Sequence, residues 1–483
     1  MIHRFVARRT ITAEEVRVLD INSTYLGVPT IRLMENAGMA VARAVMKEYK
    51  KAEKVAVICG RGNNGGDGFV AARYLSGEGL ETTVFLAESE QEISTEIAKL
   101  NFEKIRNLVR PTSEFRPVGY HVTVDALLGV GVKGKIREPY KSLIKKLNQS
   151  RKPTVSVDVP SGWPEQPSVR ANVTVTFHAE KAGMASAKCG KIIVADIGIP
   201  DEAQTHVGPG EFIYYPKPED SSHKGDNGRV LVVGGGPFTG APALAGMGAM
   251  YSGADLAHVA VPKGVAIPVA CYSPNLIIHP LSADVIVPED ILKIKELWKK
   301  ADAMVIGPGI GGDPNSLATA AELIKACPLP LVIDADALNA VKKNPKILKG
   351  KKAILTPHKG EFARLSGLKV AEDIDRRAGQ VIQTARKLGA VIIVKGHIDL
   401  ISNGSNAIKN RTGNEAMTVG GTGDVLSGIS GCLLSKGMNP FHAARLAVFM
   451  NGSAGDLAFQ EKGYGILASD VAEKIPYILR RYL

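Results

Sequence analysis

Short runs of β-branched residues alternate with longer stretches of helical apolar periodicity along the first part of the chain. Runs of the first kind predict strands, and an apolar residue at every third or fourth position predicts helices. Strand, loop, helix and strand in this rhythm predict a mostly parallel sheet with helices on both faces, a three-layer α/β domain. The predicted strands are 54–59, 82–86, 122–126, 154–157, 173–177 and 192–195, and the predicted helices are 13–25, 31–49, 67–76, 93–108 and 140–147.

A second alternation begins at Arg229–Val233 and runs to the end of the chain. Between the two alternations, Gly198–Gly228 carries four prolines among polar residues, which predicts a linker between two domains. We therefore predict two domains, residues 1–215 and 216–483. The later predicted strands are 304–306, 331–333, 353–355 and 391–394, and the predicted helices are 314–326, 374–388 and 441–459.

One uncharged segment, Val230–Ala254, resembles a membrane span in its hydropathy. It contains seven glycines and two prolines, which would break a membrane helix at several points. A strand, a glycine loop and a buried helix fit it better, so we expect a soluble protein with no membrane partner.

The net charge of +12 changes the picture little, because lysines and arginines are scattered in short runs. Scattered basic residues favour solvated helix faces and attraction of small anions over nucleic-acid binding. Aromatic residues make up only 5% of the chain, which also argues against a stacking platform for single strands. We expect no nucleic-acid partner.

Five widely spaced cysteines argue against both a disulfide framework and a zinc site, and they indicate a reducing cytoplasm. The basic segment at residues 1–10 lacks the apolar stretch of a secretory signal.

Three glycine-rich loops, each with an aspartate, carry the candidate chemistry: residues 60–68, 158–162 and 420–424. Glycine allows close approach of a ligand to the backbone, and a following helix start offers free N–H groups to phosphate. In the first loop, Gly60, Gly62 and Gly65 have dinucleotide-fingerprint spacing, while Asn63, Asn64 and Asp67 add oxygen atoms suited to a cation or a ligand. The alternative is a tight structural turn.

The segments 125–135 and 158–162 follow predicted strands, so they are expected at the same sheet edge. Together with residues 11–15, Asp20, residues 34–38, 63–67 and 174–177, they resemble the NAD(P)H-hydrate epimerase domain. The resemblance implies a Rossmann-like fold. It also implies substrate contacts by Asn63, Asn64, Gly65, Gly66, Asp67, Gly129, Val130, Gly131, Val132, Lys133, Gly134, Lys135 and Asp158, and a potassium ion held by Asn64, Asp125 and Ser161.

The substrate that this resemblance implies carries a hydroxyl at C6 of the nicotinamide ring. Exchange of its R and S forms requires that carbon to become planar and to be attacked again from the other face. Asp158 can move the proton as general acid and base, and Lys133 can steady developing charge. The segment Trp163–Pro167 is shorter than the corresponding segment of the family, so the chain departs from the family at the rim of the pocket.

In the second half, a helix beginning at Gly420-Gly421-Thr422-Gly423-Asp424 directs several N–H groups at one spot, and Asp424 can take a proton from a hydroxyl. The alternative role of Asp424 is an N-terminal charge that stabilises the helix. The motif Gly-x-Gly-Asp, at the start of a helix near the C-terminus, resembles that of proteins with the ribokinase-type fold. Segments 223–228, 239–242, 307–309, 334–339, 356–361 and 395–399 narrow the resemblance to the ADP-dependent NAD(P)H-hydrate dehydratase.

This second resemblance implies that Ala241, Gly309, His358 and Asp424 face the hydrated dinucleotide, and that Lys395, Gly396, His397, Ile398, Asp399 and Gly423 hold the adenine nucleotide. His358 has an alternative role as a helix-cap histidine. The implied chemistry is attack of the C6 hydroxyl on the terminal phosphate of ADP, the co-substrate, with Mg²⁺ spreading charge, followed by loss of phosphate.

Taken together, the chain resembles a bifunctional NAD(P)H-hydrate repair enzyme whose partners are NADH and NADPH hydrates and ADP, and we expect a homo-oligomer. Two alternatives stay open. One is a vitamin or sugar kinase with an accessory domain. The other gives the first half a non-catalytic binding or scaffold role.

Overall fold

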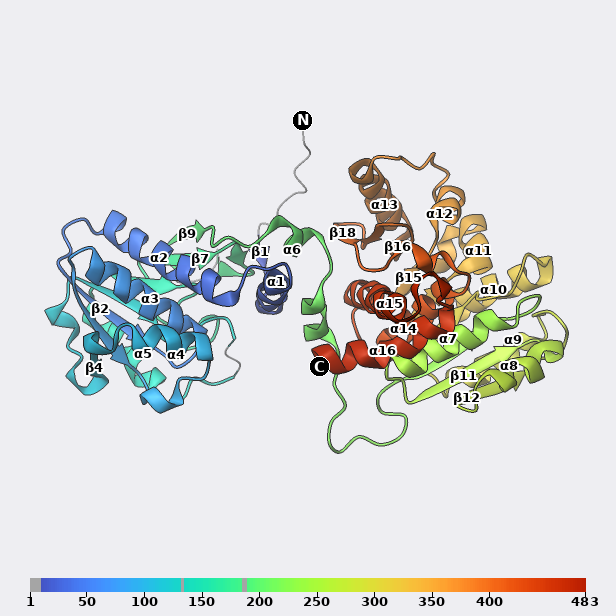
Figure 1. Ribbon diagram of the computed structural model, residues 1–483, viewed down its shortest axis with the longest axis horizontal. Coiled ribbons are helices and arrows are strands. Elements are labelled where there is room, and N and C mark those ends of the chain that lie inside the picture. The colour runs from blue at the N-terminus through green and yellow to red at the C-terminus, as the bar shows by residue number, and fades with distance from the viewer. Residues whose placement is uncertain (1–9, 132–133, 185–188) are drawn as a thin grey trace. The chain divides into compact units, whose positions relative to one another are not determined.

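The computed structural model describes residues 10–131, 134–184 and 189–483 and divides into two compact units (Figure 1). The first unit ends at Ala203 and the second runs from Gln204 to Leu483, whereas we predicted the boundary after residue 215. Residues 204–215 pack with the second unit because Val207, Phe212 and Tyr215 are buried in its core. Glu211 is also buried there in an ion pair with Arg445.

The first unit is built on a seven-stranded parallel sheet in the order β4-β3-β2-β5-β6-β7-β9, with a two-stranded parallel ladder of β1 and β8 beside it. Its strands are β1 Thr10–Ile11, β2 Lys54–Cys59, β3 Glu81–Leu86, β4 Val109–Pro111, β5 Val122–Ala126, β6 Thr154–Val157, β7 Val173–Phe177, β8 Glu180–Lys181 and β9 Lys191–Ala195. Its helices are α1 Ala13–Tyr25, α2 Thr30–Glu48, α3 Asn63–Gly77, α4 Glu96–Glu103 and α5 Tyr140–Ser150, and α6 Asp201–Thr205 spans the boundary.

Side chains of β2 alternate between two cores, as a strand buried on both faces requires. Val55, Val57 and Cys59 pack beneath α2 and α3. Ala56 and Ile58 point to the other face and pack with α5. The predicted three-layer Rossmann-like architecture is confirmed.

The second unit holds a nine-stranded sheet in the order β12-β11-β10-β13-β14-β15-β16-β17-β18. Pairing is parallel from β12 to β16 and antiparallel over the last two strands. The strands are β10 Arg229–Val233, β11 Leu256–Val261, β12 Leu276–Pro280, β13 Ala303–Ile306, β14 Leu331–Ile333, β15 Ala353–Leu355, β16 Val391–Val394, β17 Asp399–Ser402 and β18 Ala407–Asn410. The helices are α7 Gly240–Tyr251, α8 Ala266–Tyr272, α9 Asp290–Trp298, α10 Pro314–Ala326, α11 Leu338–Lys343, α12 Lys359–Ser366, α13 Ile374–Leu388, α14 Thr422–Ser435, α15 Pro440–Lys462 and α16 Ala468–Tyr482.

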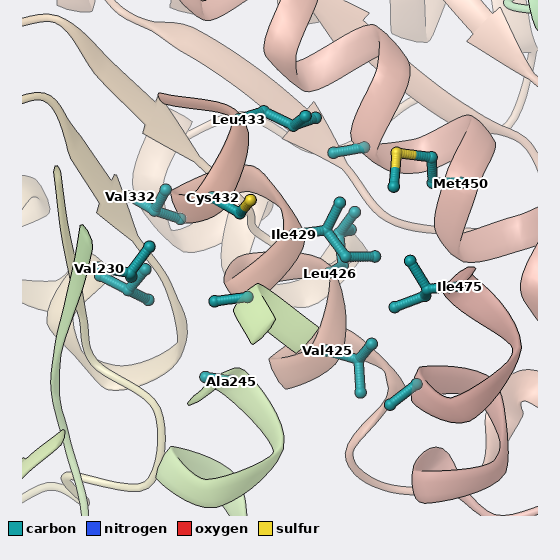
Figure 2. Close-up of a cluster of buried hydrophobic side chains, with 14 of the residues drawn as sticks. Val230, Ala245, Val332, Val425, Leu426, Ile429, Cys432, Leu433, Met450 and Ile475 are labelled. Carbon is teal, nitrogen blue, oxygen red and sulfur yellow. The ribbon is translucent and has the colours of Figure 1, made fainter. Parts of the chain in front are cut away.

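The core of the second unit is centred on α14, an almost wholly buried helix. Figure 2 shows its side chains Val425 and Ile429 among apolar side chains that include Ala245 of α7, Met450 of α15 and Ile475 of α16. Close approach of α7 requires glycine, because a Cβ on Gly428 would lie 1.9 Å from the Ala245 carbonyl oxygen. The site at the start of α14 therefore rests on a rigid element.

Both sheets have a point at which successive strands are added on opposite sides of the first strand. In the first unit this point lies between β2 and β5, and in the second between β10 and β13. Ligands of open parallel sheets bind beyond the carboxyl ends of strands at such a position. The glycine-rich loop after β2 and the glycines at 234–236 after β10 both lie there.

Several predicted elements need correction. Residues 93–108 contain only the short α4 between 3₁₀ turns, with Thr95 capping its start. The predicted connection 198–228 contains α6 and a 3₁₀ helix at Pro209–Tyr214. The uncharged segment from Val230 to Ala254 is strand, loop and buried helix as predicted. Within the described ranges no helix is both long and apolar enough to cross a membrane. All five cysteines are free thiols.

Candidate functional sites

The first glycine-rich loop is shorter than predicted, because α3 begins at Asn63 rather than at Asp67. Asn63, Asn64 and Asp67 therefore occupy the first turns of the helix, where N–H groups have no helical partner. Part of the glycine requirement is structural: a Cβ on Gly60 would lie 2.0 Å from the Leu127 carbonyl oxygen, and one on Gly65 would lie 1.9 Å from that of Gly60.

This packing predicts different effects for two glycines of the same segment. Gly65→Ala is expected to destabilise the first unit by roughly 3 kcal/mol, because the new methyl group meets backbone that cannot move alone. Gly62→Ala is the matched control and is expected to cost less than about 1 kcal/mol, since nothing lies within 4 Å of its Cβ position. Hydrogen exchange of β2 and β5 peptides measures both; equal protection in the two variants would contradict the prediction.

A cavity of about 1050 Å³ opens at the switch point of the first unit. Of the predicted contact residues, the cavity is lined by Asn63, Asn64, Asp67, Gly129, Gly131, Gly134, Lys135 and Asp158. Gly65 and Gly66 are buried and Val130 packs near Val159, so these three do not line it. Val132 and Lys133 lie outside the described residues.

Behind this cavity lies a buried polar network around Asp125. The Ser161 hydroxyl donates to Asp125 Oδ1 at 2.5 Å, and the Ser156 hydroxyl donates to Oδ2 at 2.8 Å. The Leu128 N–H donates to the Ser161 oxygen at 2.8 Å. The Asn64 amide lies against the next residue, Gly129, with its Oδ1 3.3 Å from the Cβ position. The three predicted potassium ligands therefore gather around one backbone turn, residues 128–129.

Asp158 follows β6 with a φ of 63°, a left-handed conformation that aims its carboxylate back at β7 and β8. The carboxylate accepts hydrogen bonds from the Lys181 ammonium, the Thr176 hydroxyl and the Phe177 N–H. Lys181 is only 2% exposed, and its other two donor contacts are the Thr176 oxygen at 2.9 Å and the Phe177 carbonyl at 3.0 Å. A buried ion pair with three hydrogen bonds to Oδ1 therefore fixes the orientation of Asp158.

Sequence analysis did not identify Lys181 as a site residue. Lys181 follows the end of β7 by four residues, and nothing in the neighbouring sequence predicts that its ammonium group is buried. Its role depends on the β1–β8 ladder, which places Lys181 opposite Ile11.

Two further carboxylates line the cavity beside Asp158. Burial, reinforced by the charge of Asp158, raises the pKa of Asp20 to about 6, although the Lys181 ammonium opposes this rise. Burial also raises the pKa of Asp67 well above its usual range, and Asp158 and Asp20 add to that shift. The cavity thus combines one carboxylate paired with an ammonium and two carboxyl groups whose pKa values are raised by burial.

In the second unit, α14 starts after Gly421, whose φ of 104° is available to glycine and costly for other residues. Asp424 lies in the first turn. Burial and the Asp334 carboxylate raise the pKa of Asp424 to about 7, against the opposing charge of Lys395. A general base works best when its pKa is near the operating pH, so this pKa favours the role of proton acceptor. An aspartate that only stabilises the helix end by its charge does not require a raised pKa.

Lys395 follows β16 and meets Asp334, which follows β14, with 3.0 Å between the ammonium and Oδ1. The ammonium also lies 3.0 Å from the position that a Cβ on Gly423 would occupy. The absence of a side chain at Gly423 therefore leaves room for the lysine at the start of α14. Asp334 begins the segment 334–339, which contributes to the dehydratase resemblance, but it was not predicted as a site residue. It is 2% exposed, and only the sheet order places it beside Lys395.

The remaining predicted nucleotide contacts form the turn after Lys395. Gly396 donates its N–H to Asp399 Oδ1 at 3.0 Å, and Asn410 donates to Asp399 Oδ2 at 2.9 Å. Asp399 therefore closes the turn, while His397 is exposed and Ile398 is partly exposed.

The structure brings Ala241 and Gly309 together: a Cβ on Gly309 would lie 3.1 Å from that of Ala241. His358 has the cap role that was its alternative, because its Nδ1 accepts the N–H groups of Gly360 and Glu361 at 3.0 and 3.3 Å. Its side chain is 55% exposed, and its Nε2 lies 3.5 Å from Glu361. Capping fixes the ring and leaves part of it facing solvent.

Two parallel-sheet units, one with a carboxylate-lined cavity and one with an aspartate and a lysine at a glycine-rich helix start, define a two-domain enzyme of nucleotide chemistry. Residues 230–477 match the family described as NAD(P)H-hydrate dehydratase, and residues 30–183 match the YjeF-related protein N-terminus. The bifunctional NAD(P)H-hydrate repair enzyme Nnr of Archaeoglobus fulgidus is 42% identical over 98% of this chain and 98% of its own. The protein of that name from Methanocaldococcus jannaschii is 35% identical, over 98% and 94%.

Solved structures resemble the second unit. A ribokinase-like superfamily protein of Enterococcus faecalis aligns with a TM-score of 0.50 and 24% identity over 57% of this chain and 95% of its own, which shows the fold. An ADP/ATP-dependent NAD(P)H-hydrate dehydratase of Bacillus subtilis, co-crystallised with ATP and Mg²⁺, is 27% identical over 57% and 96%, with a TM-score of 0.49. The chain belongs to the bifunctional NAD(P)H-hydrate repair enzymes and joins an epimerase domain to a dehydratase domain.

Proposed function

We propose that the first unit interconverts the R and S hydrates of NADH and NADPH in the cavity lined by Asp158. We propose further that the second unit dehydrates the S form at the expense of ADP, giving AMP and phosphate. The observation that carries the second step is the partly buried Asp424 at the start of α14, beside the Lys395–Asp334 pair. Asp424 supplies a base, and the helix start with Lys395 supplies positive potential for phosphate.

In this proposal, Asp424 takes the proton of the C6 hydroxyl as its oxygen attacks the terminal phosphorus of ADP. AMP leaves, and C6 carries a phosphate. The ring nitrogen then expels phosphate, and loss of a proton from C5 restores the reduced nicotinamide. Hydroxide is a poor leaving group and phosphate is a good one. The dehydration therefore requires a nucleotide that phosphorylates the hydroxyl.

Mg²⁺ bound with ADP would neutralise charge on the phosphate oxygens. Within the described part of the chain no cluster of three or more His, Cys, Asp or Glu residues is built to hold a metal alone. This composition fits Mg²⁺, which is commonly held by substrate phosphates and one or two carboxylates. Asp334 and Glu361, the two carboxylates whose charges act on Asp424, would supply the protein ligands.

Potassium fits the donor set of the first unit. Asn64, Asp125 and Ser161 offer an amide carbonyl, one carboxylate and a hydroxyl, and a single negative charge suits a monovalent cation. Asn64 Nδ2 is buried without a hydrogen-bond partner among the described residues. Exchanging the two ends of this amide and placing a cation against its oxygen removes the unsatisfied group. Bound there, potassium supplies a fixed positive charge beneath the cavity.

Potassium is expected to stabilise the first unit by about 2.7 kcal/mol at 100 times its dissociation constant. The measurement is hydrogen exchange of β2 and β5 peptides in KCl against choline chloride at equal ionic strength. Asn64→Ala is expected to abolish the difference, whereas Asn63→Ala, its neighbour outside the proposed ligand set, is expected to keep it. A potassium effect that survives in Asn64→Ala would contradict this ligand assignment.

The test of the whole proposal uses the full chain with mixed R and S hydrates and either ADP or ATP, following absorbance of the reduced nicotinamide. The intact protein is expected to recover both epimers with ADP. Asp158→Asn is expected to recover only the S fraction, and Asp424→Asn is expected to recover none while the epimers still interconvert. Recovery by Asp424→Asn at the intact rate would contradict the proposal.

Family membership favours this proposal over the two alternatives. A vitamin or sugar kinase would phosphorylate its alcohol and leave the hydrates untouched in the same assay. A non-catalytic first unit would leave the R hydrate unconsumed. We further propose a reducing cytoplasmic location, a homo-oligomer, and small anionic ligands rather than nucleic acid as partners; sedimentation of the purified protein tests the oligomer.

A further inference from the structure

One acidic side chain of the first cavity, Asp20, has no part in the chemistry described so far. It lies on α1 and lines the cavity together with Asp67 and Asp158. No hydrogen bond or ion pair of its carboxylate occurs within residues 10–131, 134–184 and 189–483. A carboxyl group that lines a substrate cavity without a partner is available to the substrate.

Asp20 and Asp158 differ in one respect that bears on proton transfer. Asp158 touches the Lys181 ammonium, which stabilises a carboxylate, whereas no cation of the described residues is in contact with Asp20. The negative charge of Asp158 also disfavours ionisation of Asp20, whose pKa is raised to about 6 chiefly by burial. A carboxylate held in an ion pair and a carboxyl group free of one, both lining the same cavity, can serve as base and acid.

Epimerisation at C6 requires both an acid and a base. We propose that Asp20 is a second catalytic residue of the epimerase, which protonates the C6 hydroxyl as it leaves, while Asp158 accepts the proton of the water that returns on the other face. This inference rests on the proposed function of the first unit. Lys181 is a positioning residue in it.

The step balances as follows. The C6–O bond breaks, its electron pair leaves with the oxygen, and the oxygen takes the Asp20 proton and departs as water. The ring nitrogen lone pair forms a C6=N double bond, and the carboxylates of Asp20 and Asp158 stabilise the resulting cation. Water attacks C6 from the other face and gives a proton to Asp158. One proton has moved from Asp20 to Asp158, and the reverse turnover or exchange with solvent restores the starting state.

Asp67 is less suited to this role than Asp20. Burial, with the charges of Asp158 and Asp20, raises its pKa well above the usual range, which disfavours the ionised form that each turnover would require. It also lies in the first turns of α3, among the residues expected to bind the dinucleotide.

The test is Asp20→Asn in the full chain, assayed for epimerisation of one pure hydrate without nucleotide, so that dehydration does not run. We expect kcat to fall about 10²–10⁴-fold with little change in KM. Asp20→Glu is expected to restore part of the rate. Glu78→Gln, at an exposed carboxylate beyond the end of α3, is the control and is expected to match the unsubstituted protein.

Oxygen exchange separates catalysis from a structural effect. In ¹⁸O-water, Asp20→Asn is expected to exchange the hydroxyl of one epimer without inversion, because Asp158 can still serve its own face. The ratio of exchange to inversion is then expected to rise at least about tenfold. Loss of proton transfer by Asp20 is also expected to remove the decline in rate as pH rises through about 6. The charged and titratable groups that face the cavity around Asp20 are Arg17, Arg61, Asp67, Lys135, Arg137, Asp158, His178 and Lys181.

Inversion by Asp20→Asn at a rate close to that of the unsubstituted protein would overturn the inference, as would a parallel fall of exchange and inversion that Asp20→Glu does not relieve. Absence of epimerisation in the unsubstituted protein would instead overturn the proposed function of the first unit. If Asp20→Asn does not fold, as judged by hydrogen exchange, the Asp20→Glu rate and its pH profile decide: an unchanged rate and profile overturn the inference.

Discussion

Asp424→Asn is expected to lower dehydration of the S hydrate about 10²–10⁴-fold and to leave epimerisation unchanged. The substitution keeps the shape of the side chain and removes its ability to accept a proton. Asp424 is partly buried in the first turn of α14, and Asn at this position offers no group that can take the proton. The measurement is the initial rate of reduced nicotinamide formation with ADP at saturating hydrate.

The pH dependence of this reaction follows from the same residue. A base acts in its ionised form, and burial holds the pKa of Asp424 at about 7. The rate is therefore expected to rise as pH increases through about 7 and then to level off. Asp424→Asn is expected to lose this rise, whereas Asp220→Asn, at an exposed aspartate of the second unit, is expected to keep both rate and profile. A retained pH rise in Asp424→Asn would assign it to another group.

Lys181→Met is expected to destabilise the first unit by about 3–5 kcal/mol and to abolish most epimerisation. The loss is large because the Asp158 carboxylate stays buried after its ammonium partner is gone. The remaining donors, the Phe177 N–H and the Thr176 hydroxyl, lie at 3.3 Å and cannot replace an ion pair. Hydrogen exchange of β6 and β7 peptides measures the change.

A double variant separates the two effects. Lys181→Met combined with Asp158→Asn removes both charges, so most of the stability is expected to return while epimerisation stays low. Lys191→Met is the matched control: its partner is Glu48, the lysine is 59% exposed, and the expected cost is below about 1 kcal/mol. A double variant no more stable than Lys181→Met would show that the lysine acts through packing rather than charge.

Most elements of the fold could be predicted from local pattern. Lys54–Cys59, Val173–Phe177 and Val391–Val394 begin and end where predicted, because each is rich in the β-branched residues that favour strands. Local pattern placed the start of α3 too late, since Asn63-Asn64-Gly65-Gly66 has low helix propensity. Packing of Gly60 and Gly65 against neighbouring backbone, which involves residues far along the chain, sets that start.

Sequence alone determined the two alternating α/β patterns, the three glycine-rich loops and the acidic residues Asp158 and Asp424, because each is a local property of neighbouring residues. Tertiary structure decided which side chains share a site. Lys181 meets Asp158 only because a short ladder with Ile11 carries β8 to the cavity, and Asp334 meets Lys395 only through the order of strands in the second sheet. A charge buried by distant segments has no local signature, so the partners that hold Asp158 and Lys395 in place emerge only when the chain is folded.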